Sequence, residues 1–170
     1  MLVDIAHASE AVIDDILELS TLPIVSSHTG VRGVCNNQRN LRDEHLKGIA
    51  ATGGVVGVAY FEPAVCGDNI LDSIVETVVY LKNLIGTEHI ALGSDFDGTV
   101  RVPFDTSKLI YITDALMRKG FSNTEIGNLF PPFPPPFFFF LSSSFLCSAN
   151  YGRKCSKSIA SSASGHFFNQ

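Results

Sequence analysis

The sequence predicts an α/β fold in which helices cover a parallel β-sheet, and three observations support this prediction. Short apolar runs alternate along the chain with longer segments whose apolar residues recur at helical spacing. The short runs are apolar almost throughout, which is typical of strands buried on both faces of a parallel sheet. Residues that commonly begin helices stand where the periodic segments start. A repeated strand–helix unit of this kind fits either a doubly wound sheet or part of a (β/α) barrel.

Four strand–helix units are predicted, followed by one short helix. The strands are expected at residues 1–7, 22–28, 53–61 and 88–95. The helices are expected at residues 9–20, 42–54, 68–86 and 106–120, and the short helix at 122–129. Ser9 is placed to cap the first helix, Asp43 to cap the second, and Gly53 to end it. Ser122 and Glu125 have the spacing of a capping box.

Composition and charge narrow the classes of function. Hydrophobic residues form 45% of the chain and charged residues 17%, as in globular proteins, and 170 residues suffice for one sizeable core. The net charge is −5 and lysines and arginines do not cluster, which argues against binding to nucleic acids or anionic membranes. Neither a signal peptide nor an apolar stretch long enough to span a membrane is recognised, so a cytoplasmic location is the default expectation.

The four cysteines show no CxxC spacing and form no dense framework. They are Cys35, Cys66, Cys147 and Cys155. Free thiols in a reducing compartment are therefore expected, and disulfides are the alternative.

The composition changes abruptly near residue 130. From Phe130 onward the sequence is first almost only Phe, Pro, Leu and Ser, and then rich in serine without periodicity. Consecutive prolines remove backbone donors and fix φ, so neither a helix nor a central strand fits there. We expect a partial (β/α) barrel at residues 1–129 and a low-complexity tail at 130–170 that is disordered or mistranslated. The tail's residues have pyrimidine-rich codons, so a translated intron end would produce such a run.

Polar side chains stand at the ends of three predicted strands. His7 ends the first strand, His28 the second and Asp95 the fourth. Because parallel strands point the same way, their carboxyl ends share one rim, where α/β folds build active sites. Two imidazoles and a carboxylate suit a divalent metal such as zinc, and Asp95 could also accept a proton from an activated water.

From these residues alone, structural roles for His7, His28 and Asp95 are as well supported as metal binding. A single histidine at a strand end is more often a hydrogen-bonded structural residue than a ligand, and only the combination of three residues favours a metal. His45 and His89 are expected to be structural or solvated, and Asp97 to brace the turn before Gly98. Arg39 lies in a long loop on the same rim, where it could bind a substrate carboxylate with two hydrogen bonds.

These residues stand in motifs that resemble the membrane dipeptidase (renal dipeptidase) family of zinc peptidases. Four motifs agree in order and approximate spacing: LVDIAHAS, PIVSSHTGVRGVCNNQRNL, GGVVGVAYF and HIALGSDFDG. The segment TDALMRKGFSNTEIGNL resembles the C-terminal helices of the family, so the resemblance covers residues 1–129. It implies the C-terminal half of a TIM-like (β/α)8 metallohydrolase barrel, which in the family holds two zinc ions and cleaves dipeptides.

The resemblance also implies a role for each candidate residue. His7 and His28 would bind one zinc, and Asp95 would bind the other and assist the bridging water. Arg39 would bind the C-terminal carboxylate of a dipeptide substrate.

The departures from the family pattern limit what this chain is expected to do alone. The family also uses a His-x-Asp pair, a bridging Glu and a further His, and no His-x-Asp pair occurs here. We expect a truncated fragment that is inactive alone, holds at most one zinc weakly, and self-associates or pairs with a missing N-terminal half. The alternatives are another amidohydrolase-type metal-dependent hydrolase, or a non-catalytic fragment or degenerate binding or assembly module.

Overall fold

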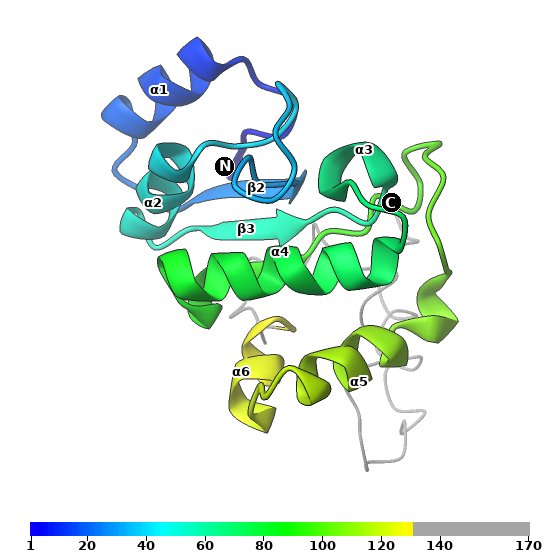
Figure 1. Cartoon of the computed structure of the whole chain (residues 1–170). Coiled ribbons are helices and arrows are strands. Elements are labelled where there is room, and N and C mark those ends of the chain that lie inside the picture. Colours follow the sequence, from blue (N-terminus) through cyan, green and yellow to red (C-terminus); the bar gives the residue numbers. More distant parts are fainter. Residues whose placement is uncertain (131–170) are drawn as a thin grey trace, which may run out of the picture. The chain divides into compact units, whose positions relative to one another are not determined.

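The structure, a computed structural model, describes residues 1–130 and contains a four-stranded parallel sheet in the order β1-β2-β3-β4 (Figure 1). The strands are β1 (Val3–Asp4), β2 (Ile24–Thr29), β3 (Val55–Val58) and β4 (Ile90–Leu92). The predicted α/β class with four parallel strands is thus confirmed. The predicted tail at 130–170 lies outside the described residues apart from Phe130, so the proposed domain boundary stays a prediction.

All five predicted helices are present, and the structure also contains one further short helix and two 3-10 turns. They are α1 (Glu10–Leu19), α2 (Asp43–Ala51), α3 (Glu62–Val65), α4 (Ile70–Ile85), α5 (Ile110–Arg118) and α6 (Asn123–Asn128), with 3-10 turns η1 (Thr87–His89) and η2 (Thr106–Lys108). The short helix α3 was not predicted, although Pro63 in its first turn is a favourable helix start. Ser9 caps α1, and Ser122 and Glu125 form the predicted capping box of α6.

The cap predicted for α2 is wrong. The N-cap residue is Arg42, which makes no side-chain cap bond, and Asp43 is the first helical residue. The Asp43 carboxylate instead accepts a hydrogen bond from the Tyr80 hydroxyl at 2.7 Å, so it joins α2 to α4. Gly53, with φ of 76°, follows the end of α2 as predicted.

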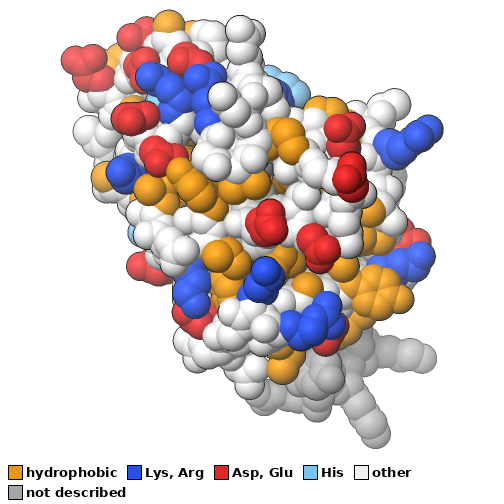
Figure 2. All heavy atoms as spheres, viewed as in Figure 1, with side chains coloured by type: hydrophobic (Ala, Val, Ile, Leu, Met, Phe, Trp, Pro, Cys, Tyr) orange, Lys and Arg blue, Asp and Glu red, His pale blue; other side chains and the backbone are white. Residues whose placement is uncertain are grey.

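Helices α2 and α4 pack along one face of the sheet, and α5 packs against α4 (Figure 1). The strands and these helices bury the core, which includes Ile24, Val56, Ile74 and Ile90. On the same face of the molecule, acidic and basic side chains are interspersed with hydrophobic ones (Figure 2). Over α1 and α2 the opposite charges form ion pairs: Arg42 contacts Glu10 and Asp14 at 3.3 Å each. No helix within residues 1–130 is both long and apolar enough to cross a membrane.

The strands are shorter than predicted, and His7 and Asp95 therefore lie in the loops that follow β1 and β4. The reason at β1 is a side chain that takes over backbone bonding. Asp4 Oδ1 accepts hydrogen bonds from the backbone N–H groups of both Ala6 and Ser27 at 3.0 Å. The chain then turns sharply, because Ala8 N–H donates to the Ile5 carbonyl.

Two cysteines form a disulfide, so the expectation of free thiols is wrong for this pair. Cys35 and Cys66 are bonded, with their Cα atoms 5.5 Å apart. They lie 31 residues apart in sequence, and only the fold brings the loop after β2 against the end of α3. Disulfides are rare in cytosolic proteins, so this pair argues against the default expectation of a cytoplasmic location, which stays untested.

Candidate metal and substrate site

The rim at the carboxyl ends of the strands brings His7, His28 and Asp95 together. The two imidazoles face each other, with 2.9 Å between His7 Nε2 and His28 Nε2. Asp95 Oδ2 lies 3.9 Å from His28 Nε2. His7 is exposed, whereas the side chains of His28 and Asp95 are 17% and 15% exposed. Residues separated by 88 positions in sequence thus share one partly open site, because their strands are parallel.

His7 and Asp95 both have unusual backbone conformations. Their φ values are 66° and 57°, in the left-handed region that non-glycine residues avoid. Backbone strain of this kind persists where the surrounding structure imposes it, and it is frequent at functional sites. Each residue follows a strand by three positions, so the left-handed turn directs the chain away from the sheet at the rim.

The surroundings of His28 favour a neutral imidazole. Burial lowers the pKa of His28, and the nearby Asp95 carboxylate only partly opposes this effect. The Ser27 hydroxyl lies 2.9 Å from His28 Nδ1, which leaves Nε2 facing His7. A neutral imidazole with one ring nitrogen held by a hydrogen bond is the form that binds metals.

The spacing of the two histidines fits two ligands of one zinc ion. Zinc–nitrogen bonds of about 2.0–2.1 Å in a tetrahedron place two nitrogen ligands about 3.3 Å apart, close to the 2.9 Å separation here. Across residues 1–130, however, no group of three or more His, Cys, Asp or Glu side chains is arranged to hold a metal ion. The described residues therefore fit a pair of ligands with a carboxylate nearby, and they do not complete a metal centre.

Arg39 reaches the same rim from the loop between β2 and α2. Its guanidinium donates a hydrogen bond from Nη2 to the His28 carbonyl at 2.9 Å, and its Cζ atom lies 6.0 Å from the centre of the Phe61 ring. Burial lowers the pKa of Arg39, but an arginine stays charged at neutral pH. The site thus presents a fixed positive charge next to the strand that carries His28.

A cavity of about 470 Å³ opens beside this region between α3 and the loop after β4. It is lined by Phe61, Glu62, Pro63, Ile70 and residues 100–103. Phe61 therefore borders both the Arg39 guanidinium and the cavity.

Among the residues that the structure describes, His45 and His89 have structural roles, as expected. The His45 side chain is 1% exposed, and its Nε2 lies 3.0 Å from Asp14 Oδ1 and 2.8 Å from Arg42 Nη2. His89 Nδ1 lies 2.9 Å from the Gly54 carbonyl, at the opposite end of the sheet.

At the turn before Gly98, the Gly98 N–H donates to the Asp95 carbonyl, and no hydrogen bond from the Asp97 side chain is found in residues 1–130.

Three residues that hold the loop of Arg39 were not singled out by sequence reasoning. Arg32, Asn37 and Asn40 bind backbone carbonyls in that loop and in α3. The only local signal was the density of asparagines in CNNQRN, and asparagine in a loop has many unrelated roles.

The chain is similar to one family of peptidases. The model of the family described as "Membrane dipeptidase (Peptidase family M19)" matches residues 1–131. Dipeptidase verJ of Clonostachys rogersoniana is 31% identical over 133 residues, which cover 76% of this chain and 34% of the relative. Dipeptidase 3 of Rattus norvegicus is 30% identical over 144 residues, which cover 78% and 29%.

A Klebsiella pneumoniae protein named "Uncharacterized protein in pqqA 5′ region" is 38% identical over 104 residues, 58% of this chain and 38% of that protein. This chain thus spans about a third of the length of the curated relatives it matches.

Solved structures show the same fold. The dipeptidase AC, a metallo peptidase of family M19, superposes with a TM-score of 0.68 at 26% identity, covering 74% of this chain and 38% of that one. The same values hold for a metallo peptidase from Rhodobacter sphaeroides liganded with a phosphinate mimic of the dipeptide L-Ala-D-Ala. The probable dipeptidase PvdM from Pseudomonas aeruginosa, at 20% identity and a TM-score of 0.68, supports the fold alone; 76% of this chain and 47% of that one are covered.

Proposed function

The chain belongs to the membrane dipeptidase family (peptidase family M19), and we propose that it supplies part of the active site of a metal-dependent dipeptidase. The observation that carries this proposal is the convergence of His7, His28, Asp95 and Arg39 on one rim of the sheet. Two metal ligands, a carboxylate and a fixed positive charge are part of what metal-dependent hydrolysis of a dipeptide with a free C-terminus requires. The metallo peptidase liganded with a dipeptide mimic supports this substrate class.

The proposal gives His7, His28 and Asp95 roles at the metal ions. His7 and His28 would hold one zinc ion through their Nε2 atoms, which lie 2.9 Å apart. Asp95, whose Oδ2 lies 3.9 Å from His28 Nε2, would bind a second ion and could accept a proton from the attacking water. When bound, the metal supplies Lewis-acid polarisation of the carbonyl and lowers the pKa of water.

Arg39 recognises the substrate in this scheme. A guanidinium binds a carboxylate through two parallel hydrogen bonds, which orients the peptide as well as attracting it. Because Arg39 also contacts the His28 carbonyl, the carboxylate would be held at a fixed position relative to the metal ligands. The cavity beside Phe61 offers apolar room for the side chain of the substrate's C-terminal residue.

We infer that this chain alone is not active. It carries no His-x-Asp pair, and its described residues form no complete metal centre. Two imidazoles and solvent hold at most one zinc ion weakly, because structural and catalytic zinc sites use three or four protein ligands. Activity would require the remaining ligands from other residues.

The test is zinc binding and dipeptide hydrolysis by this chain and three variants. Isothermal titration with zinc is expected to show at most one weak site, which disappears in His7→Ala and in His28→Ala. His89→Gln removes an imidazole at the other end of the sheet and is expected to bind as the wild type does. Zinc binding that survives both rim substitutions would refute the assigned ligand pair.

Measurements of hydrolysis distinguish a dipeptidase from another metal-dependent hydrolase and from a non-catalytic module. With L-Ala-D-Ala as substrate and zinc present, no turnover is expected from the chain alone. Turnover of a lactone or a simple amide, but not of dipeptides, would favour another metal-dependent hydrolase. The absence of both zinc binding and turnover would favour a non-catalytic binding or assembly module, which the incomplete metal centre in residues 1–130 also allows.

A further inference from the structure

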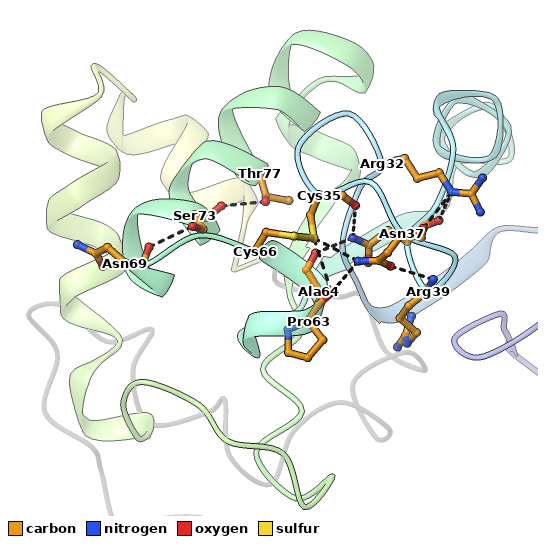
Figure 3. Close-up of a disulfide and its surroundings, with 11 residues drawn as sticks. Arg32, Cys35, Asn37, Arg39, Pro63, Ala64, Cys66, Asn69, Ser73 and Thr77 are labelled. Carbon is orange, nitrogen blue, oxygen red and sulfur yellow. Dashed lines mark hydrogen bonds between the residues drawn. A yellow bond between two sulfur atoms is a disulfide. The ribbon is translucent and has the colours of Figure 1, made fainter.

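We propose that Asn40 is the positioning residue that fixes the substrate-binding Arg39, by fastening the loop of residues 31–41 to α3. This loop is called the Arg39 loop below. The inference rests on the proposed role of Arg39 and adds a residue that acts through it. Figure 3 shows the disulfide with Asn37, Arg39 and Ala64 near it.

The side-chain amide of Asn40 bridges two segments that are distant in sequence. Its Nδ2 donates hydrogen bonds to the carbonyls of Cys35 and Ala64, both at 2.7 Å. Asn40 is only 3% exposed, so solvent does not compete for these bonds. One amide group therefore closes the Arg39 loop on itself and also binds it to α3.

Two further connections join the same elements. Asn37 Nδ2 donates to the Pro63 carbonyl at 2.8 Å, and the Cys35–Cys66 disulfide crosses from the loop to the residue after α3 (Figure 3). The packing is close, because a Cβ atom on Gly30 would come within 1.9 Å of the Ala64 carbonyl oxygen. The loop thus has little freedom to move relative to α3.

The backbone on both sides of Arg39 is held as well. Arg32 Nε donates to the carbonyls of Asn37 and Asn40, both at 3.1 Å, and Arg32 also pairs with Glu10 at the start of α1. The Arg39 N–H donates to Asn37 Oδ1 at 2.9 Å. Because Asn40 is bound through both its side chain and its carbonyl, it is the fixed point directly next to Arg39.

The geometry requires an asparagine because two hydrogen-bond donors are used. An ionised aspartate has the same shape but only acceptors, so it would place a negative charge against two carbonyl oxygens. Asn36, in the same loop, is exposed and makes no side-chain hydrogen bond within residues 1–130. The matched pair Asn40→Asp and Asn36→Asp therefore changes the charge identically while only one variant breaks the connection.

Amide hydrogen exchange of the chain tests the connection without any ligand. In Asn40→Asp the backbone amides of residues 39–41 are expected to exchange at least tenfold faster, while those of β3 and α4 keep their protection. In Asn36→Asp all of them are expected to match the wild type. If the Asn40→Asp chain does not fold, Asn40→Ser, which keeps one donor, takes its place with a smaller expected increase. Wild-type exchange at residues 39–41 in either Asn40 variant would overturn the proposal.

Ligand selectivity tests whether the connection positions Arg39. In an NMR titration, L-Ala-D-Ala is expected to bind the Asn40→Asp chain at least tenfold more weakly, and its C-terminal amide within twofold of wild type. Equal weakening of both ligands, or of neither, would overturn the positioning role. If the wild-type chain binds neither ligand, the proposed substrate role of Arg39 fails, and the exchange measurement alone decides whether Asn40 fixes the loop.

Discussion

His7 shows how a residue of the candidate site lowers the stability of the fold that carries it. With φ of 66° it sits in the left-handed region, where a Cβ atom is crowded by the following carbonyl. Glycine has no Cβ and adopts this conformation freely. The proposed metal-binding role of His7 is thus accompanied by backbone strain at the rim.

This leads to a prediction for two substitutions at one position. Both His7→Gly and His7→Ala remove the imidazole, so both lose zinc binding, but only His7→Gly relieves the strain. The free energy of unfolding of His7→Gly should exceed that of His7→Ala by about 1 kcal/mol. Urea denaturation followed by circular dichroism measures the difference. Equal midpoints for the two variants would show that the left-handed conformation is not strained.

At this scale the sequence predicted which residues meet at the rim of the sheet, but not those that hold loops. His7, His28 and Asp95 could be selected because a parallel sheet brings strand ends together whatever the details of packing. Asn40 could not be selected, because one of its partners, Ala64, lies 24 residues away and belongs to a helix that was not predicted. Its partners are also backbone carbonyls, which every residue has, so the residue types do not reveal them.

At the scale of elements, the capping box of α6 predicts a pH dependence. The hydrogen bond with Lys82 and those with Ser122 lower the pKa of Glu125 to about 2, from 4.5. A carboxylate with a depressed pKa stabilises the fold fully above pH 4.5, and this contribution is lost as the pH falls from 4.5 toward 2. Acidification therefore removes support from the start of α6 and from its contact with α4.

Glu125→Gln isolates this effect, because glutamine keeps the capping shape but cannot be charged. The wild type is expected to be more stable than the variant at pH 6, and the difference should shrink as the pH falls from 4.5 toward 2. Urea denaturation of both proteins between pH 2 and 7 measures it. A difference that does not change with pH would mean that the charge of Glu125 contributes nothing.

The disulfide between the loop after β2 and the end of α3 is expected to raise the free energy of unfolding. Linking Cys35 to Cys66 constrains 31 residues of the unfolded chain, and a bond of this span typically contributes about 2–4 kcal/mol. Reduction should lower the unfolding midpoint by a corresponding amount, and the double variant Cys35→Ala/Cys66→Ala should behave like the reduced protein. Adding reductant to the double variant is the control and should change nothing. An unchanged midpoint of the wild type on reduction would contradict the prediction.

The type of each helix or strand was predicted better than the residues at which it begins and ends. Helical periodicity identified α1, α4 and α5, whose buried faces are set by their own sequences. Strand ends depend on partners: β1 stops at Asp4 because the carboxylate of that residue bonds Ser27 on the neighbouring strand. The sequence of one strand cannot reveal such a bond.

At the scale of the whole molecule, both outer strands of the sheet pair on one side only within residues 1–130. The order β1-β2-β3-β4 leaves one edge of β1 and one edge of β4 without a strand partner in this part of the chain. Parallel sheets are normally covered or closed, because an open edge is a template for pairing with another chain. The solved M19 structures that this chain resembles have a TIM-barrel-like fold, and a sheet closed into a barrel has no open edge.

We therefore predict that the isolated chain self-associates through these edges. Light scattering should show a mass that rises with concentration instead of a constant monomer. Ala91 is half-buried in β4, and Ala91→Lys places a charge at this edge, so it should reduce the association. Ala51→Lys adds the same charge at an exposed position of α2 and should leave association unchanged. A wild-type chain that stays a monodisperse monomer at every concentration would show that its sheet edges are already covered, and would remove the argument that it needs a partner to complete its barrel.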